Sequence, residues 1–139
     1  MRITVDTNIL ISATFWKGDS LKIINLVENG VIELFLSQEI IEEFSEVLNY
    51  KEIQEKIKNK NLEMKRTVEE IITLSSMVIP KRKVDLVKSD SDDNKIIECA
   101  LEGRVDYIIT NDAHLLDLKE VEGIKILKPA DFLKIVENK

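Results

Sequence analysis

Four acidic residues stand where a carboxylate is unusual, either at the end of an apolar strand or on the apolar face of a helix. They are Asp6, Glu43, Asp93 and Asp112. Carboxylates that face one another repel, and their pKa values rise unless divalent cations neutralise them. Oxygen ligands suit Mg²⁺ or Mn²⁺ better than zinc, and such ions activate water and stabilise the leaving oxygen of a phosphodiester. The four acids therefore predict metal-dependent phosphodiester hydrolysis.

Two of these acids follow strand-like segments. Ile3 and Val5 are β-branched and lead into Asp6, while the apolar run 105–110 leads through Asn111 into Asp112. In open α/β sheets, ligands bind outside the carboxyl ends of the strands, so both acids are expected at that edge. Asp6 has an alternative reading as the cap of the turn that follows it.

The other two acids are placed by helical periodicity. Glu43 is the acid closest to the arc formed by Ile40, Ile41, Phe44, Val47 and Leu48. Asp93 lies in the middle of the arc formed by Ile96, Ile97 and Ala100, whereas Asp92 falls to one side. Burying a carboxylate costs several kcal/mol unless it is paired, hydrogen-bonded or bound to metal, which favours a metal role for Asp93. Glu43 can also be a boundary residue whose carboxylate reaches solvent, and Asp90 and Asp92 can simply cap a helix.

Strand-like and helix-like segments alternate along the chain, which predicts an α/β fold with a parallel, doubly wound sheet. We expect strands near residues 2–5, 31–36, 105–110 and 124–127, and possible strand structure at 77–79. One helix is expected to end before Gly30, and another to begin after the N-cap candidate Ser37. A pair of helices is expected over 51–76, with Asn61 as the cap of the second. The last two helices are expected from about 91 to Gly103 and from Pro129 onward.

Composition limits the remaining possibilities. The 139 residues, 44% of them hydrophobic, suit a single domain spanning 1–139, and no apolar run reaches the roughly 20 residues of a membrane span. We expect a cytoplasmic protein. The single cysteine, Cys99, excludes an internal disulfide and a cysteine-based zinc site, and its apolar neighbours predict burial.

The net charge of −6 does not indicate a nucleic-acid-binding protein by itself, because such domains are usually basic. A polyanionic substrate would need local basic patches or metal ions to overcome the repulsion. Lysine and arginine gather in two segments, which are either solvated faces or a substrate-binding patch. The members are Lys56, Lys58, Lys60, Lys65 and Arg66, followed by Lys81, Arg82 and Lys83.

Taken together, these motifs resemble the PIN-domain family, and in particular the branch of toxins similar to the VapC ribonucleases. The resemblance is carried in the family's order by the segments 6–10, 37–48, 90–100, 107–112 with 115–116, and 128–133. It covers essentially the whole chain. Each motif is weak alone, whereas their order and spacing are specific.

The resemblance implies a three-layer α/β/α sandwich with a parallel, roughly five-stranded sheet. It also implies a Mg²⁺- or Mn²⁺-dependent endoribonuclease acting on RNA, frequent homodimers, and an antitoxin protein that blocks the site. The family's acids fall on Asp6, Glu43, Asp93 and Asp112, and Asn8 and Thr110 match supporting polar positions. Ser91 stands where that branch often has proline, and Asn111 where glycine or arginine is common, so we expect these two loops to differ in shape from those of that branch.

The same residues bear on other protein classes. A haloacid-dehalogenase-type phosphatase needs an aspartate two residues after Asp6, where Asn8 stands, and the pattern of a receiver domain is also missing. A non-catalytic PIN scaffold that acts as a binding module remains the main alternative, although retention of all four acids argues against it. The only histidine, His114, follows Asp112 and is expected at the surface.

Overall fold

The computed structural model describes residues 1–15, 18–60, 69–88 and 91–138 of the chain. Its strands are β1 (Arg2–Val5), β2 (Glu33–Ser37), β3 (Ser76–Val78), β4 (Tyr107–Ile109), β5 (Glu120–Val121) and β6 (Ile124–Leu127). Its helices are α1 (Thr7–Phe15), α2 (Asp19–Glu28), α3 (Gln38–Leu48), α4 (Lys51–Lys60), α6 (Ser91–Gly103), α7 (Ala113–Leu118) and α8 (Pro129–Glu137). Residues 69–74 are also helical.

The strands form one sheet in the order β3-β2-β1-β4-β6-β5. All neighbouring strands are parallel except β5, which runs antiparallel to β6. The expected parallel α/β sheet is therefore confirmed, and the two-residue β5 extends it at one edge. The strand order reverses between β1 and β4, because β2 and β3 lie on one side of β1 and the later strands lie on the other. Such a reversal is where open α/β sheets bind ligands.

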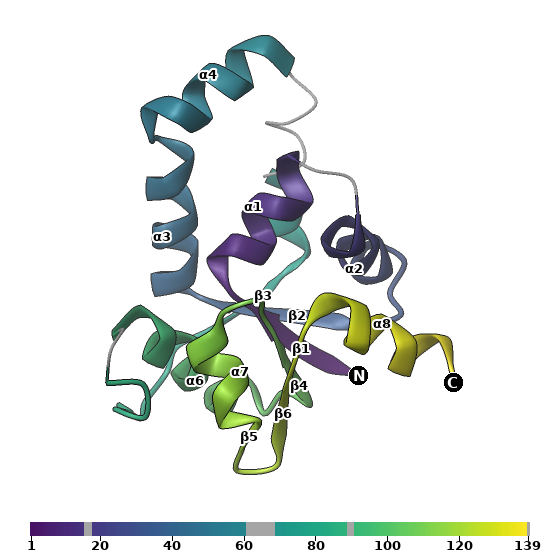
Figure 1. Cartoon of the computed structure of the whole chain (residues 1–139), viewed down its shortest axis with the longest axis vertical. Coiled ribbons are helices and arrows are strands. Elements are labelled where there is room, and N and C mark those ends of the chain that lie inside the picture. Colours follow the sequence, from purple (N-terminus) through teal and green to yellow (C-terminus); the bar gives the residue numbers. More distant parts are fainter. Residues whose placement is uncertain (16–17, 61–68, 89–90, 139) are drawn as a thin grey trace.

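Helices cover both faces of this sheet, as the three-layer prediction requires. Helices α6 and α7 lie on one face, while α1, α2 and α8 lie on the other (Figure 1). Helix α3 starts directly at the end of β2, and α4 extends from it away from the sheet (Figure 1). No helix in the described ranges is long and apolar enough to cross a membrane.

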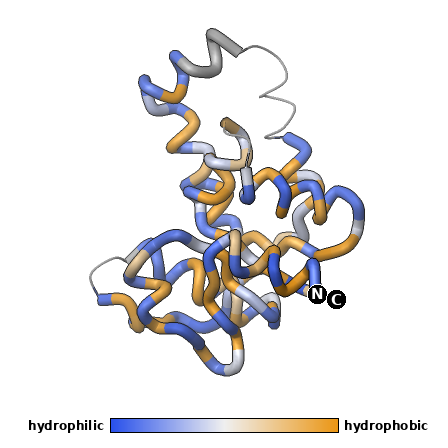
Figure 2. Tube along the Cα trace, turned by 45° about the vertical axis from the view of Figure 1, so that its right-hand side comes forward, coloured by the Kyte–Doolittle hydropathy of each residue, from blue (hydrophilic) through white to orange (hydrophobic). Residues whose placement is uncertain are grey.

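The core lies between the sheet and its helices. The side chains of Ile3, Leu34, Leu36 and Ile108 are at most 1% exposed, so the central strands are buried on both faces. Central parallel strands have this continuous apolar character because helices cover them on both sides. Hydrophobic and hydrophilic residues alternate along the helices (Figure 2). The buried apolar residues of the helices, such as Ile9, Ile40 and Ile97, belong to the same core cluster as those of the strands.

Several of the predicted element boundaries are confirmed by specific contacts. The Ser37 hydroxyl accepts a hydrogen bond from the Ile40 backbone N–H at 3.3 Å, so Ser37 is the N-cap of α3. Gly30 adopts a φ of 74° after α2, a left-handed conformation that glycine adopts without strain. Gly103 is the last residue of α6, and Pro129 is the first of α8.

Other boundaries differ from the sequence prediction. Strand β2 begins at Glu33 rather than at Val31, which is 52% exposed, and β4 spans only three residues. The possible strand at 77–79 is observed as β3. The predicted helical pair is described only at its two ends, α4 and residues 69–74, and the expected cap Asn61 and residues 62–68 lie outside the described residues.

Candidate functional site

The candidate site lies at the carboxyl ends of β1 and β4, where the strand order reverses. In the register of these neighbours, Val5 pairs with Ile109. Asp6 and Thr110 follow these two residues, and the Asp6 backbone N–H continues the pairing by donating to the Ile109 carbonyl at 3.3 Å. The side chains of Asp6 and Thr110 therefore meet although 104 positions separate them in the sequence.

Both oxygens of the Asp6 carboxylate are engaged. Oδ1 accepts a hydrogen bond from the Ile9 backbone N–H at 2.9 Å, and Oδ2 accepts one from the Thr110 hydroxyl. The first bond is the capping interaction that the alternative reading predicts, and the second ties the residue to β4. Asp6 is only 5% exposed.

Burial raises the pKa of Asp6 above its ordinary value. Hydrogen bonds from the Thr110 side chain and from the backbone of Ile9 and Asn8 oppose that shift, whereas the charge of Asp112 adds to it. The Asn8 side chain is exposed, so its described support for Asp6 comes from the backbone.

Thr110 also connects Asp6 to the last acid. Its hydroxyl oxygen accepts a hydrogen bond from the Asp112 backbone N–H at 2.9 Å while the hydroxyl donates to Asp6. Asp112 is the N-cap of α7, and its Oδ1 accepts from the backbone N–H groups of His114 at 2.8 Å and Leu115 at 3.3 Å. One buried threonine therefore links the carboxylate of Asp6 to the backbone of Asp112.

Glu43 reaches the same edge from α3 and is half-buried, whereas Glu42 and Glu46 are exposed. Glu39, in the first turn of the same helix, is also half-buried. Burial raises the pKa of Glu43, and the nearby charges of Asp92 and Asp6 add to the shift. The Thr7 side chain and the charge of Lys95 oppose it.

The structure separates the adjacent acids of α6 as the helical periodicity predicted. Asp93 is 6% exposed, whereas Asp92 is exposed and pairs with the Lys95 ammonium at 3.1 Å. Potential metal-binding atoms of Asp93, Asp112 and His114 all lie within 4.8 Å of one another. Asp6 and Glu43 lie outside this cluster, but the charge of Asp112 raises the pKa of Asp6, and the charge of Asp6 raises that of Glu43.

Two further polar residues of this region were not assigned to the site from the sequence. His114 is exposed, as expected, but its Nδ1 lies 3.7 Å from Asp112 Oδ1. Asn94 is buried beside Asp93; its side-chain oxygen accepts from the backbone N–H groups of Leu86 and Val87 at 2.9 Å each, and its amide donates to the Val87 carbonyl at 2.8 Å. Helical periodicity did not single out Asn94, because it lies outside the arc of Ile96, Ile97 and Ala100.

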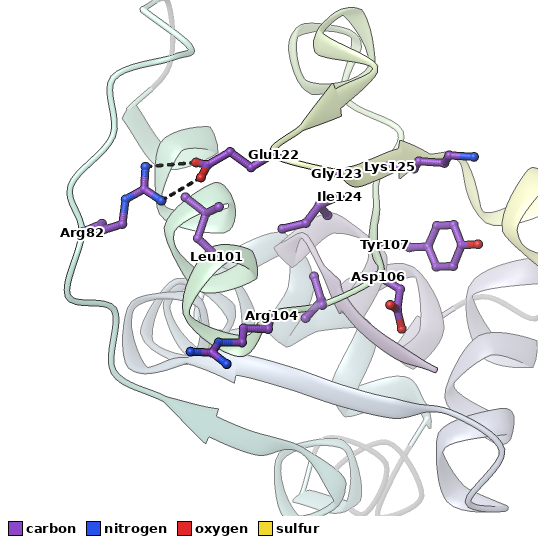
Figure 3. A pocket seen from close by; sticks show the side chains of 10 residues that line it. Arg82, Leu101, Arg104, Asp106, Tyr107, Glu122, Gly123, Ile124 and Lys125 are labelled. Carbon is purple, nitrogen blue, oxygen red and sulfur yellow. Dashed lines mark hydrogen bonds and ion pairs between the residues drawn. The ribbon is translucent and has the colours of Figure 1, made fainter.

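A pocket of about 520 Å³ lies at the opposite edge of the sheet, near the amino ends of β4 and β6 (Figure 3). At its rim, the Arg82 guanidinium forms a two-point ion pair with the Glu122 carboxylate, at 3.1 and 3.0 Å. Lys83 lies 3.9 Å from Glu98. These contacts favour the interpretation that residues 81–83 form a solvated surface, because Arg82 lies away from the end of the sheet that carries Asp6 and Asp112. The side chains of 56–60 and all of Lys65 and Arg66 lie outside the described part of the chain.

Comparisons with known proteins agree with this geometry. The family model described as "PIN domain" matches residues 2–114. The fold is similar to the crystal structure of PAE2754 from Pyrobaculum aerophilum, with a TM-score of 0.64 over 100% of this chain and 91% of that chain. The sequence identity in that comparison is 11%, so the likeness concerns the fold alone. No curated protein matches the sequence.

Proposed function

The chain belongs to the PIN-domain family, and on that premise we propose that it is a metal-dependent endoribonuclease that hydrolyses RNA phosphodiester bonds. PIN domains are generally metal-dependent nucleases. The observation that carries the proposal is the cluster of Asp93, Asp112 and His114, whose potential metal-binding atoms lie within 4.8 Å of one another. The buried Asp6, which the charge of Asp112 influences, and Glu43, which the charge of Asp6 influences, complete the proposed group of acids.

The residues of this group suit a hard divalent cation. Their donors are carboxylate oxygens, and the mutual repulsion that helps to raise the pKa values of Asp6 and Glu43 is relieved by positive charge. Asp6, Glu43, Asp93 and Asp112 would hold Mg²⁺ or Mn²⁺. When bound, such an ion supplies charge that stabilises the leaving oxygen and eases deprotonation of the attacking water.

The remaining contribution of the chain is positioning. Thr110 holds the carboxylate of Asp6 and the backbone of Asp112, and Asn94 ties the segment before α6 to the helix that carries Asp93. Groups oriented in this way lose little freedom when a substrate phosphate binds, which lowers the entropic part of the barrier. Lys95 pairs with Asp92 at 3.1 Å and also interacts electrostatically with Glu43, and its positive charge would offset repulsion of a phosphate there.

The finer assignment rests on the resemblance of the motifs to VapC-like ribonucleases. On that basis we propose that residues 1–139 form a single nuclease domain that acts in the cytoplasm as the toxin of a toxin-antitoxin pair. The same resemblance supports a homodimer and a cognate antitoxin that covers the carboxylate edge.

Two neighbouring substitutions test the proposed nuclease. Asp93→Asn keeps the shape of the buried side chain but removes its charge, so RNA cleavage with Mg²⁺ or Mn²⁺ should fall by at least about a hundredfold. Asp92→Asn makes the same chemical change on the exposed side of α6 and should alter cleavage less than about threefold. Cleavage is measured on a mixed RNA pool with excess metal and with EDTA.

The outcome separates the nuclease from a non-catalytic scaffold. A scaffold would show no metal-dependent cleavage with any of the three proteins, even where it retained RNA in a binding assay. Normal cleavage by the Asp93→Asn variant would remove Asp93 from the active site and defeat the metal-site assignment.

A further inference from the structure

His114 lies within the acidic group although its residue type does not belong to the predicted carboxylate set. It occupies the first turn of α7, where its backbone N–H donates to the capping oxygen of Asp112 at 2.8 Å. That turn brings the imidazole back beside the same carboxylate, with Nδ1 3.7 Å from Oδ1. Asp93 approaches from α6 to complete a cluster whose ligand atoms lie within 4.8 Å of one another.

The spacing of these atoms is close to that of ligands around one ion. Ligand atoms of an octahedral site with bonds near 2.1 Å are separated by about 3 Å when adjacent and about 4.2 Å when opposite. The His114 side chain is 58% exposed, and that of Asp112 is 28% exposed. Both side chains are therefore partly open to solvent, and rotation about their side-chain torsions changes the distances between their ligand atoms without movement of the backbone.

We propose that His114 is a direct ligand of the divalent ion at this site and that its ring nitrogen makes the site prefer Mn²⁺ to Mg²⁺. The inference rests on the proposed function, because it concerns the metal of the same site. Mg²⁺ is a hard ion that takes oxygen ligands and retains water, whereas transition-metal ions also accept imidazole nitrogen. A site made only of Asp6, Glu43, Asp93 and Asp112 would lack this basis for discrimination.

A surface ion pair between His114 and Asp112 is the competing explanation of the contact. Exposed pairs of this kind contribute little to stability. They also predict no bond between the imidazole and a bound ion, so spectroscopy of the bound ion distinguishes the two explanations.

Pulsed electron paramagnetic resonance of the Mn²⁺-loaded full chain tests the ligand directly. The sequence contains one histidine, so in protein prepared without a histidine tag any imidazole nitrogen coupled to Mn²⁺ must belong to His114. We expect nitrogen coupling in the wild-type protein and its loss in His114→Ala. Bound Mn²⁺ without nitrogen coupling in the wild type would overturn the inference, and so would failure of the protein to bind Mn²⁺.

The preference for Mn²⁺ is tested by competition between the two ions. His114→Ala should weaken Mn²⁺ binding about tenfold or more, while Mg²⁺ binding should change less than about twofold. Asp117→Asn, an exposed substitution on the same helix, is the matched control and should leave both affinities unchanged. An equal change for the two ions, or no change for either, would contradict the preference.

RNA cleavage by the same preparations keeps this inference separate from the proposed function. Metal-dependent cleavage without nitrogen coupling would refute the role of His114 and leave the nuclease intact. Nitrogen coupling without cleavage would support the ligand and refute the nuclease.

Discussion

Replacing Thr110 with valine should remove the hydroxyl that links the carboxylate of Asp6 to the backbone of Asp112. Valine has a similar shape, so the change removes the donor to Asp6 Oδ2 and the acceptor of the Asp112 backbone N–H with little loss of packing. Thr110 is fully buried, and no exposed surface lets water replace the lost hydroxyl easily. The substitution therefore measures how strongly β4 fixes the site.

The expected cost follows from the two lost hydrogen bonds. A hydrogen bond to a charged group contributes about 1.5–3 kcal/mol, and a half-buried N–H left without an acceptor adds up to about 1 kcal/mol. The free energy of unfolding at pH 7 without metal should therefore fall by about 2–4 kcal/mol. For a domain of this size, that loss corresponds to a decrease in Tm on the order of 10 °C.

The pH dependence identifies the charged partner. Burial raises the pKa of Asp6 in the folded protein, so its ionised form destabilises the fold above that pKa. This penalty disappears as the pH falls through the folded-state pKa toward about 4, the ordinary value of an aspartate. The Thr110 hydrogen bond lowers the pKa of Asp6, and its loss should therefore raise this pKa further. The difference between Thr110→Val and wild type should be largest at neutral pH.

Urea unfolding followed by circular dichroism, with EDTA present, measures these differences at pH 7 and pH 4.5. Thr110→Ser is the control, because it keeps the hydroxyl and loses one buried methyl group, at a cost of about 1 kcal/mol that should not depend on pH. If Thr110→Val lost the same free energy at both pH values, the hydroxyl would not be supporting an ionised Asp6. Thr110 would then have no electrostatic role in the site.

Three further predictions test the surroundings of the site. Mn²⁺ at about 100 times its Kd should add about 2.7 kcal/mol to the free energy of unfolding in thermal melts. This gain should be lost in Asp93→Asn. Identical melts of the wild type with and without Mn²⁺ would contradict the prediction. Asn94→Ala removes three hydrogen bonds to Leu86 and Val87 and should lower the free energy of unfolding, measured in urea, by about 2–3 kcal/mol. A decrease smaller than about 1 kcal/mol would show that these hydrogen bonds have no structural role. Burial raises the pKa of the Cys99 thiol to about 11, so thiol reagents at pH 8 should label it only after unfolding, and rapid labelling of the folded protein would show that the helix opens.

Local patterns in the sequence were sufficient for most of the elements, though not for α1, α7 and β5, and for the buried sides of α3 and α6. Asp93 is buried and Asp92 exposed because the apolar arc of α6 must cover the strands, and a rotation of 100° per residue places the two acids differently. The cap at Ser37 and the proline at the start of α8 depend only on neighbouring residues, and they too were predictable. Burial of Cys99 followed from its apolar neighbours.

Tertiary structure alone decided which of these residues meet. Thr110 contacts Asp6 because β1 and β4 are neighbours in a particular register, and no periodicity along either strand specifies its partner strand. In the same way, Asn94 binds a segment that precedes its helix, and Arg82 pairs with Glu122 at the edge away from the acids. Sequence periodicity reports which face of an element is buried, whereas strand order and loop paths are set by the packing of the whole chain. The acids could therefore be proposed from the sequence, but the contacts of Thr110 with Asp6 and Asp112 could be assigned only from the fold.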